Sequence, residues 1–193
     1  DITEITPDIL SKYENDPQYK VVENPAYWGY KLALNMKKRP ELKDKKLRQA
    51  LAYAIDKEEL VEKVARGAAK VASPGYLPVE HVWYNENVKK YDFDLDKAKE
   101  LLDGKSYDFT LLTGDSNSEL RIGELIKISL GKVGINIEVR SVDSKSRDAA
   151  IKEGDYEMAL NGYGGWGGDP DILRNQYASI DSEGTMFAGI SGY

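Results

Sequence analysis

The chain has 193 residues, of which 41% are hydrophobic and 31% are charged, and its net charge is −6 at pH 7. This composition is typical of a globular protein with one sizeable domain or two small ones. The acidic balance disfavours nucleic acid as a partner, because phosphate binding needs Lys and Arg clustered on one face. No cysteine and a single histidine, His81, are present, which excludes disulfides and thiolate or multi-histidine metal sites within these residues. We therefore expect no metal and no cofactor.

The ends of the chain and its apolar runs indicate whether it carries a membrane span or a targeting segment. No apolar run approaches the roughly 18 residues of a membrane span. The chain begins at Asp1 without a start methionine or a signal peptide, and it ends at Tyr193 without a polar tail. We therefore expect it to be a piece of a longer protein, with any targeting segment or anchor outside it.

The first elements in chain order are a short helix and a strand. Pro7–Leu10 is typical of a helix start, and Val21-Val22 indicates the end of a strand. Apolar and other residues alternate over 27–35 (YWGYKLALN), which predicts a strand with one face in the core. We expect Trp28 and Tyr30 to be core residues, with ligand contact as the alternative.

The most regular segment is 43–67, with the sequence KDKKLRQALAYAIDKEELVEKVARG. Apolar residues recur at helical spacing after Asp44, and Asp56 with Glu59 three residues later forms a capping-box pattern. The segment therefore predicts two consecutive helices that end at Gly67.

The remaining chain alternates between helical and strand patterns. Helices are predicted over 94–102, 119–133 and 143–153, and strands over 107–113, 134–139 and 154–160. This alternation indicates an α/β fold, a layered open sheet flanked by helices.

A glycine-rich stretch, 161–171 (NGYGGWGGDPD), follows the last predicted strand. Glycine lets the backbone approach a ligand, while Tyr163 and Trp166 supply flat apolar surface. Asp169-Pro170-Asp171 is typical of a helix start. The stretch is either a ligand-binding loop or a tight strand-to-helix connection with one core tryptophan, and Asp169 is either a helix cap or a ligand contact.

These motifs, in this order, resemble one family. The segment 43–67, preceded by a strand ending in LALNM and followed by ASPGYLP, resembles the signature of the solute-binding proteins of peptide and nickel ABC importers. The family pattern D-x-x-x-R-x-A-L-x-x-A-I-D-[RK] is matched by Asp44, Arg48, Ala50, Leu51, Ala54, Ile55, Asp56 and Lys57. The segment 94–102 resembles the family's D-x-x-K-A-K-x-L-L helix, and 134–139 resembles its L-x-x-x-G-I-x-V step.

The resemblance implies that residues 1–193 are one lobe of a two-lobed, periplasmic-binding-protein-like receptor outside the cytoplasm. The partners it implies are a peptide ligand, the second lobe and ABC permease subunits, with membrane contact through a lipid anchor on the full-length protein. An oligosaccharide ligand is the alternative within the family. A role in signalling rather than import is left open.

The resemblance also places ligand contacts in the glycine-rich stretch. The expected ligand-binding residues are Tyr163, Gly164, Gly165, Trp166 and Asp169. In the relatives a W-x-x-D-x-x-D-P segment occupies this position, and its first Asp pairs with the peptide's ammonium group. Here Trp166 takes the place of that Asp, so a peptide bound in the standard way is disfavoured unless another acid substitutes.

Enzyme activity is not expected. Asp92, Asp94 and Asp96 lack the glycine and glutamate of a calcium loop, which favours a solvated helix start. A hydrolase using Asp169 and Asp171 as acid and base is the rival hypothesis, but residues two apart at a helix start point in different directions.

Three further residues have structural expectations. We expect His81 at the surface or at a hinge. Arg121 and Arg147 are expected to form salt bridges, with a place in the ligand cleft as the alternative.

Overall fold

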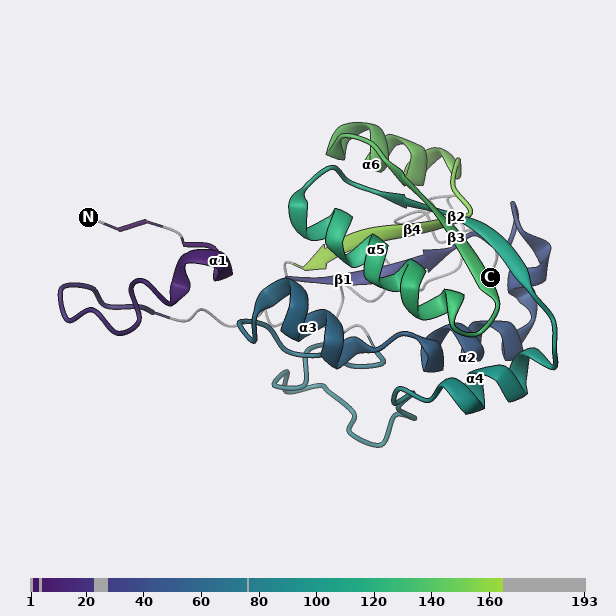
Figure 1. The fold of residues 1–193 in the computed structure, drawn as a ribbon, viewed down its shortest axis with the longest axis horizontal. Coiled ribbons are helices and arrows are strands. Elements are labelled where there is room, and N and C mark those ends of the chain that lie inside the picture. The colour runs from purple at the N-terminus through teal and green to yellow at the C-terminus, as the bar shows by residue number, and fades with distance from the viewer. Residues whose placement is uncertain (1, 4, 23–27, 76, 165–193) are drawn as a thin grey trace.

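The computed structural model describes residues 2–3, 5–22, 28–75 and 77–164. Figure 1 shows that a mixed sheet lies at its centre. Its strands are β1 (Trp28–Leu34), β2 (Tyr107–Thr113), β3 (Ile135–Ser141) and β4 (Met158–Gly164). They lie in the order β1-β4-β2-β3, with β2 parallel to both β3 and β4 and β1 antiparallel to β4. The predicted α/β open sheet is confirmed.

Helices cover both faces of this sheet. The helices of the described chain are α1 (Pro7–Leu10), α2 (Lys45–Ala54), α3 (Lys57–Ala65), α4 (Leu95–Leu102), α5 (Asn117–Gly131) and α6 (Ser144–Glu153), with a 3-10 turn, η1 (Pro40–Lys43). In Figure 1, α1 lies apart from the sheet. None of the helices formed by the described residues has the length and apolar character needed to span a bilayer.

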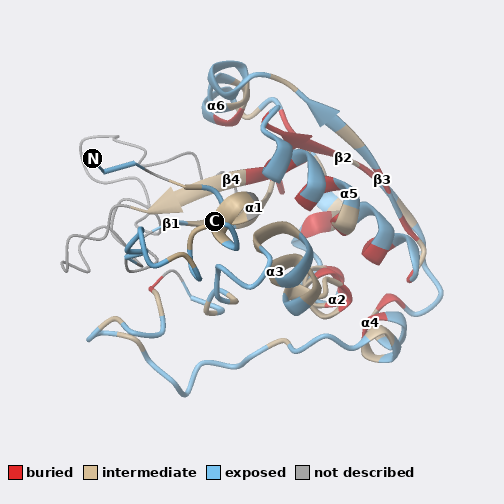
Figure 2. Ribbon diagram, turned by 60° about the vertical axis from the view of Figure 1, so that its left-hand side comes forward, coloured by how far each residue is buried: buried red, intermediate tan, exposed pale blue. Residues whose placement is uncertain are grey.

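The core lies on both sides of β2, whose side chains alternate between the faces. Leu111 packs with α2, α4 and α5 in the larger cluster, whereas Leu112 packs with Ile151 of α6 in the smaller one. Figure 2 shows the buried residues gathered along β2, β4 and the inner sides of α2 and α5, and Figure 1 shows α6 on the opposite side of the sheet from α5. Each buried Leu contributes about 1.5–3 kcal/mol, so this two-sided burial holds the layers together.

Side-chain caps set where the helices begin. In α2 to α6, a carboxylate or hydroxyl oxygen at the N-cap accepts a hydrogen bond from a backbone N–H of the first turn, which satisfies a donor that the helix leaves free. The capping residues are Asp44, Asp56, Asp94, Ser116 and Asp143. The cap at Asp94 confirms the interpretation of Asp92, Asp94 and Asp96 as a helix start.

Two residues of the signature region have structural roles. The buried Asn35 donates from Nδ2 to the carbonyl of Gly154 at 2.9 Å, and its Oδ1 accepts from the N–H groups of Lys37 and Lys38 at 3.1 Å. Arg48 donates from Nη1 to the carbonyls of Leu42 and Lys43, both at 2.8 Å. The Asn35 bond joins the end of β1 to the turn before β4, and the Arg48 bonds join α2 to η1.

Two strand predictions are corrected. Val21 and Val22 belong to no strand in the described chain and are exposed, because no neighbouring strand pairs with them. The last strand was predicted over 154–160 but spans Met158–Gly164. Gly154 instead ends α6 with φ at 75°, and Asn161–Gly164 pair with β1 rather than forming a loop.

Candidate ligand-binding site

The end of the β1–β4 ladder alternates aromatic residues with glycine. Trp28 pairs with Gly164, Gly29 with Tyr163, and Tyr30 with Gly162. Each ring therefore faces a strand position that has no side chain, which leaves room for it to lie across the partner strand. The arrangement puts three aromatic rings at the carboxyl end of β4, with Trp28 and Tyr30 on one face of the sheet and Tyr163 on the other.

Gly29 is required by the ring of Tyr163. A Cβ atom at position 29 would lie 3.0 Å from both Cζ and Oη of Tyr163, closer than ordinary van der Waals contact. The amino group of Lys31 lies 5.9 Å from the centroid of the same ring, within the range of a cation–π interaction. Burial lowers the pKa of the Lys31 ammonium.

Trp28 and Tyr30 are not core residues. The side chain of Trp28 is 76% exposed and that of Tyr30 is 44% exposed. The period of two in the sequence gives the face of a strand, but it cannot tell whether another element covers that face. The expectation that both belong to the core is wrong, and both rings are exposed to solvent.

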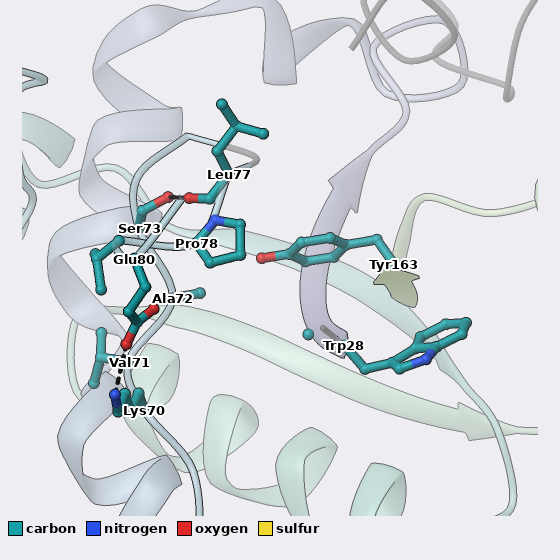
Figure 3. A pocket seen from close by; sticks show the side chains of 11 residues that line it. Trp28, Lys70, Val71, Ala72, Ser73, Leu77, Pro78, Glu80 and Tyr163 are labelled. Atoms are coloured by element: carbon teal, nitrogen blue, oxygen red, sulfur yellow. Dashed lines mark hydrogen bonds and ion pairs between the residues drawn. The ribbon is translucent and has the colours of Figure 1, made fainter. Parts of the chain in front are cut away.

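A small cavity lies beside this ladder, and Figure 3 shows the Tyr163 ring pointing toward Pro78 across it. Its volume is about 60 Å³, and the loop 70–80 forms the wall opposite the two strands. The apolar lining side chains of the loop are Val71, Ala72, Leu77, Pro78 and Val79. The hydroxyl of Ser73 donates to the carbonyl of Leu77 at 2.5 Å and so closes the loop on itself.

One ion pair lies among the residues that line the cavity. Lys70 Nζ lies 2.5 Å from Glu80 Oε1, with both side chains more than half exposed. The Lys70 ammonium holds the pKa of the Glu80 carboxyl below its usual range. This charge pair joins the two ends of the loop at the edge of an otherwise apolar cavity.

A second ion pair lies at the carboxyl end of β2, between the first turns of α5 and α6. Arg147 donates from Nη1 to Glu119, and its Nε and Nη2 both donate to Asp148. The Glu119 carboxylate covers Gly114, where a side chain would collide with it. Burial raises the pKa of the Tyr30 hydroxyl, and the nearby Glu119 carboxylate raises it further. The salt-bridging role expected for Arg147 is confirmed.

The predicted site residues divide into two groups. Tyr163 and Gly164 end β4, and Tyr163 lines the cavity. Gly165, Trp166 and Asp169 lie outside the described residues, as does Asp171. His81 is half-buried, where its Nδ1 accepts from the N–H of Trp83 at 3.2 Å, and Arg121 is exposed on α5.

Sequence reasoning missed the loop 70–80 as a wall of the site. A signal was present, because apolar residues alternate there with Ser, Pro and Gly in VASPGYLPV, which is typical of an ordered loop rather than a solvated one. The described residues hold no group of three or more His, Cys, Asp or Glu side chains able to bind a metal ion. The arrangement suits an organic ligand with an apolar group and a charge.

Comparisons with known proteins identify the family. Residues 1–184 match the family described as bacterial extracellular solute-binding proteins, family 5 Middle. The chain belongs to this family. The resemblance inferred from the ordered sequence motifs is thereby confirmed.

This family 5 chain is similar in sequence to binding proteins of other bacteria. It is 30% identical over 172 residues to heme-binding protein A of Haemophilus influenzae, covering 84% of this chain and 31% of that protein. It is 29% identical over 182 residues to the dipeptide-binding protein of Escherichia coli, covering 90% and 33%.

A solved structure extends the likeness to the fold. The periplasmic binding protein DppA of Helicobacter pylori, in complex with the peptide STSA, is 27% identical with a TM-score of 0.78, and the match covers 89% of this chain and 34% of that one. The chain thus spans about a third of the length of the relatives it matches.

Proposed function

We propose that residues 1–193 form the ligand-binding lobe of an extracytoplasmic receptor that binds peptides for an ABC importer. The observation that carries the proposal is the apolar cavity at the carboxyl end of β4, where the Tyr163 ring lies across Gly29 and points toward the loop, with the exposed rings of Trp28 and Tyr30 on the other face of the same strand ends. In open α/β sheets, ligands bind outside the carboxyl ends of the strands. The names of the relatives, a dipeptide-binding protein among them, support a peptide ligand.

The mechanism is closure of two lobes on the ligand. A second lobe would cover the exposed rings of Trp28 and Tyr30 and enclose the ligand between the two surfaces. Excluding water strengthens hydrogen bonds and charge interactions with the ligand, so the bound state favours the closed form. The closed receptor then delivers the peptide to the permease. Attachment to the membrane would come from a lipid anchor outside this chain.

The contact residues expected from the sequence belong to this proposal. We place Tyr163, Gly164, Gly165, Trp166 and Asp169 against the ligand, with Tyr163 and Gly164 at the described end of the group. The relatives and the solved structure named above have peptide or heme names rather than sugar names, so a peptide is preferred to an oligosaccharide. Their names describe binding proteins, which agrees with the expectation that the chain is not an enzyme.

The first prediction concerns Trp28. Replacing Trp28 by Ala in the full-length receptor should weaken peptide binding by about 1–3 kcal/mol, because a ligand group loses the ring it packs on. The melting temperature of the unliganded receptor should hardly change, because the ring is exposed. Calorimetric titration with panels of short peptides and oligosaccharides measures the affinity.

Trp83→Ala is the matched control, because Trp83 is also exposed but does not line the cavity. It should leave the affinity unchanged. Equal affinity of the Trp28→Ala variant and the wild type would contradict the assigned site, and binding of oligosaccharides in place of peptides would contradict the ligand class.

A further inference from the structure

The Lys70–Glu80 pair is placed where a ligand's charged end would meet the cavity. Of the described side chains that line the cavity, these two are the charged ones, and the others are apolar, aromatic or hydroxyl-bearing apart from Gly29. Figure 3 shows the pair at one end of the loop, with the Tyr163 ring on the far side of the apolar wall. The cavity therefore offers an apolar space next to one negative and one positive charge.

Opening this ion pair costs little. Both side chains are more than half exposed, at 71% for Lys70 and 56% for Glu80. Exposed pairs of this kind contribute about 0–1 kcal/mol, because water competes for both charges and two long side chains lose freedom. A ligand cation that reaches Glu80 when the site is closed to water gains more than the pair loses, since charge-assisted hydrogen bonds strengthen away from solvent.

The buried acid near the ladder, Glu119, is already paired with Arg147. The Glu119 side chain is 6% exposed, accepts from Arg147 and lies over Gly114. Using it for a ligand cation would take from Arg147 its buried partner and leave it with the exposed Asp148 alone, which is costly. Glu80 is therefore the described acid at the site that can change partner cheaply.

The size of the cavity limits what enters it. Its volume of about 60 Å³ is several times the roughly 10–15 Å³ that one water molecule needs. A small apolar side chain fits this space, whereas a whole peptide does not. The charge at the edge and the apolar interior together match the first residue of a peptide, whose ammonium group lies one carbon from its side chain.

We propose that Glu80 binds the free ammonium group of a peptide ligand, whose small apolar first side chain occupies the cavity between Tyr163 and the loop 70–80. This proposal rests on the proposed peptide-binding function. Lys70 then competes with the ligand for the Glu80 carboxylate and holds it in place while the site is empty.

The test uses the full-length receptor and mixed-sequence tripeptides with a small apolar first residue, each with a free or an N-acetylated amino end. Wild-type receptor should bind the free form about tenfold or more tightly than the acetylated form, as one charge-assisted hydrogen bond provides. Glu80→Gln should remove this preference. Glu86→Gln, an exposed acid of the same loop region that does not line the cavity, should keep it.

A lysine variant separates recognition from a merely structural role of the pair. Lys70→Met should tighten binding of the free peptides by up to about fivefold, because Glu80 loses its competing partner. If the pair only holds the loop together, Lys70→Met and Glu80→Gln will weaken binding to the same extent, and the proposal is wrong. Equal binding of free and acetylated peptides by the wild type also overturns it while leaving peptide binding intact. If the wild-type receptor binds none of the tripeptides, both this proposal and the proposed peptide-binding function are wrong.

Discussion

At the scale of single residues, the site depends on glycines that face rings. Gly29 is the clearest case, since the Tyr163 ring lies where its side chain would be. A glycine in a strand usually weakens it, so this position is explained by the close approach of the ring. Gly162 is less constrained, because Cζ3 of Trp28 would lie 3.9 Å from a Cβ at position 162, which is an ordinary contact.

We predict that Gly29→Ala will displace the Tyr163 ring and change the wall of the cavity. Overpacking of this kind costs about 1–3 kcal/mol of stability, and peptide affinity should fall because Tyr163 no longer faces Pro78. Thermal unfolding and calorimetric titration measure the two effects. Gly75→Ala is the control, because its Cβ would meet Ser73 Oγ at 3.8 Å, an ordinary contact. Equal melting temperatures and equal peptide affinities of the Gly29→Ala and Gly75→Ala variants would contradict this role of Gly29.

Residue-level prediction from the sequence was partial for physical reasons. Tyr163 was proposed as a ligand contact because aromatic residues among glycines are typical of a ligand surface, and its ring lines the cavity, but ligand contact stays a prediction. The exposure of Trp28 could not be predicted, because it depends on which elements cover the end of β1. The partners of Glu119 and Glu80 also required the structure, since each is separated in sequence from the basic residue it meets.

At the scale of elements, the Glu119–Arg147 pair joins two helices that lie on opposite faces of the sheet. The pair is well shielded from water, with the Arg147 side chain 11% exposed and that of Glu119 6% exposed. Because α5 follows β2 and α6 follows β3, their first turns meet at the carboxyl end of the sheet. The pair fixes the backbone at Gly114 and so the edge next to Tyr30.

Arg147→Met is expected to destabilise the receptor by about 3–5 kcal/mol, because it leaves the Glu119 carboxylate buried without a partner. Adding Glu119→Gln should restore much of the loss, since the buried charge is then gone. Chemical denaturation measures both variants, and Arg121→Met on the exposed side of α5 should stay within about 0.5 kcal/mol of wild type. If the Arg147→Met variant is as stable as the wild type, the Glu119–Arg147 pair contributes nothing to stability.

Most elements could be predicted because local signals agree with the fold. The N-caps Asp44, Asp56, Asp94 and Asp143 lie where the sequence pattern placed helix starts, and β2 has the predicted bounds of 107–113. The end of β4 was misplaced because Asn161–Gly164 have weak strand propensity, with two glycines among four residues. Pairing with β1 overrides that propensity, and pairing is a tertiary effect.

At the scale of the whole molecule, the family assignment follows from the order of the elements and is confirmed by the match over residues 1–184. The described residues supply one surface with exposed rings, an apolar cavity and an ion pair at its edge. Since the chain spans about a third of its relatives' length, the remaining part of the receptor would supply the opposing surface. Our central claim is that a peptide holds these two surfaces together.

Solution scattering of the full-length receptor, with and without a peptide whose binding calorimetry has established, tests this claim most directly. The account predicts a smaller radius of gyration at saturating peptide, and no such decrease for a variant carrying Trp28→Ala at a peptide concentration that saturates only the wild type. An unchanged radius of gyration for wild-type receptor saturated with peptide would contradict lobe closure.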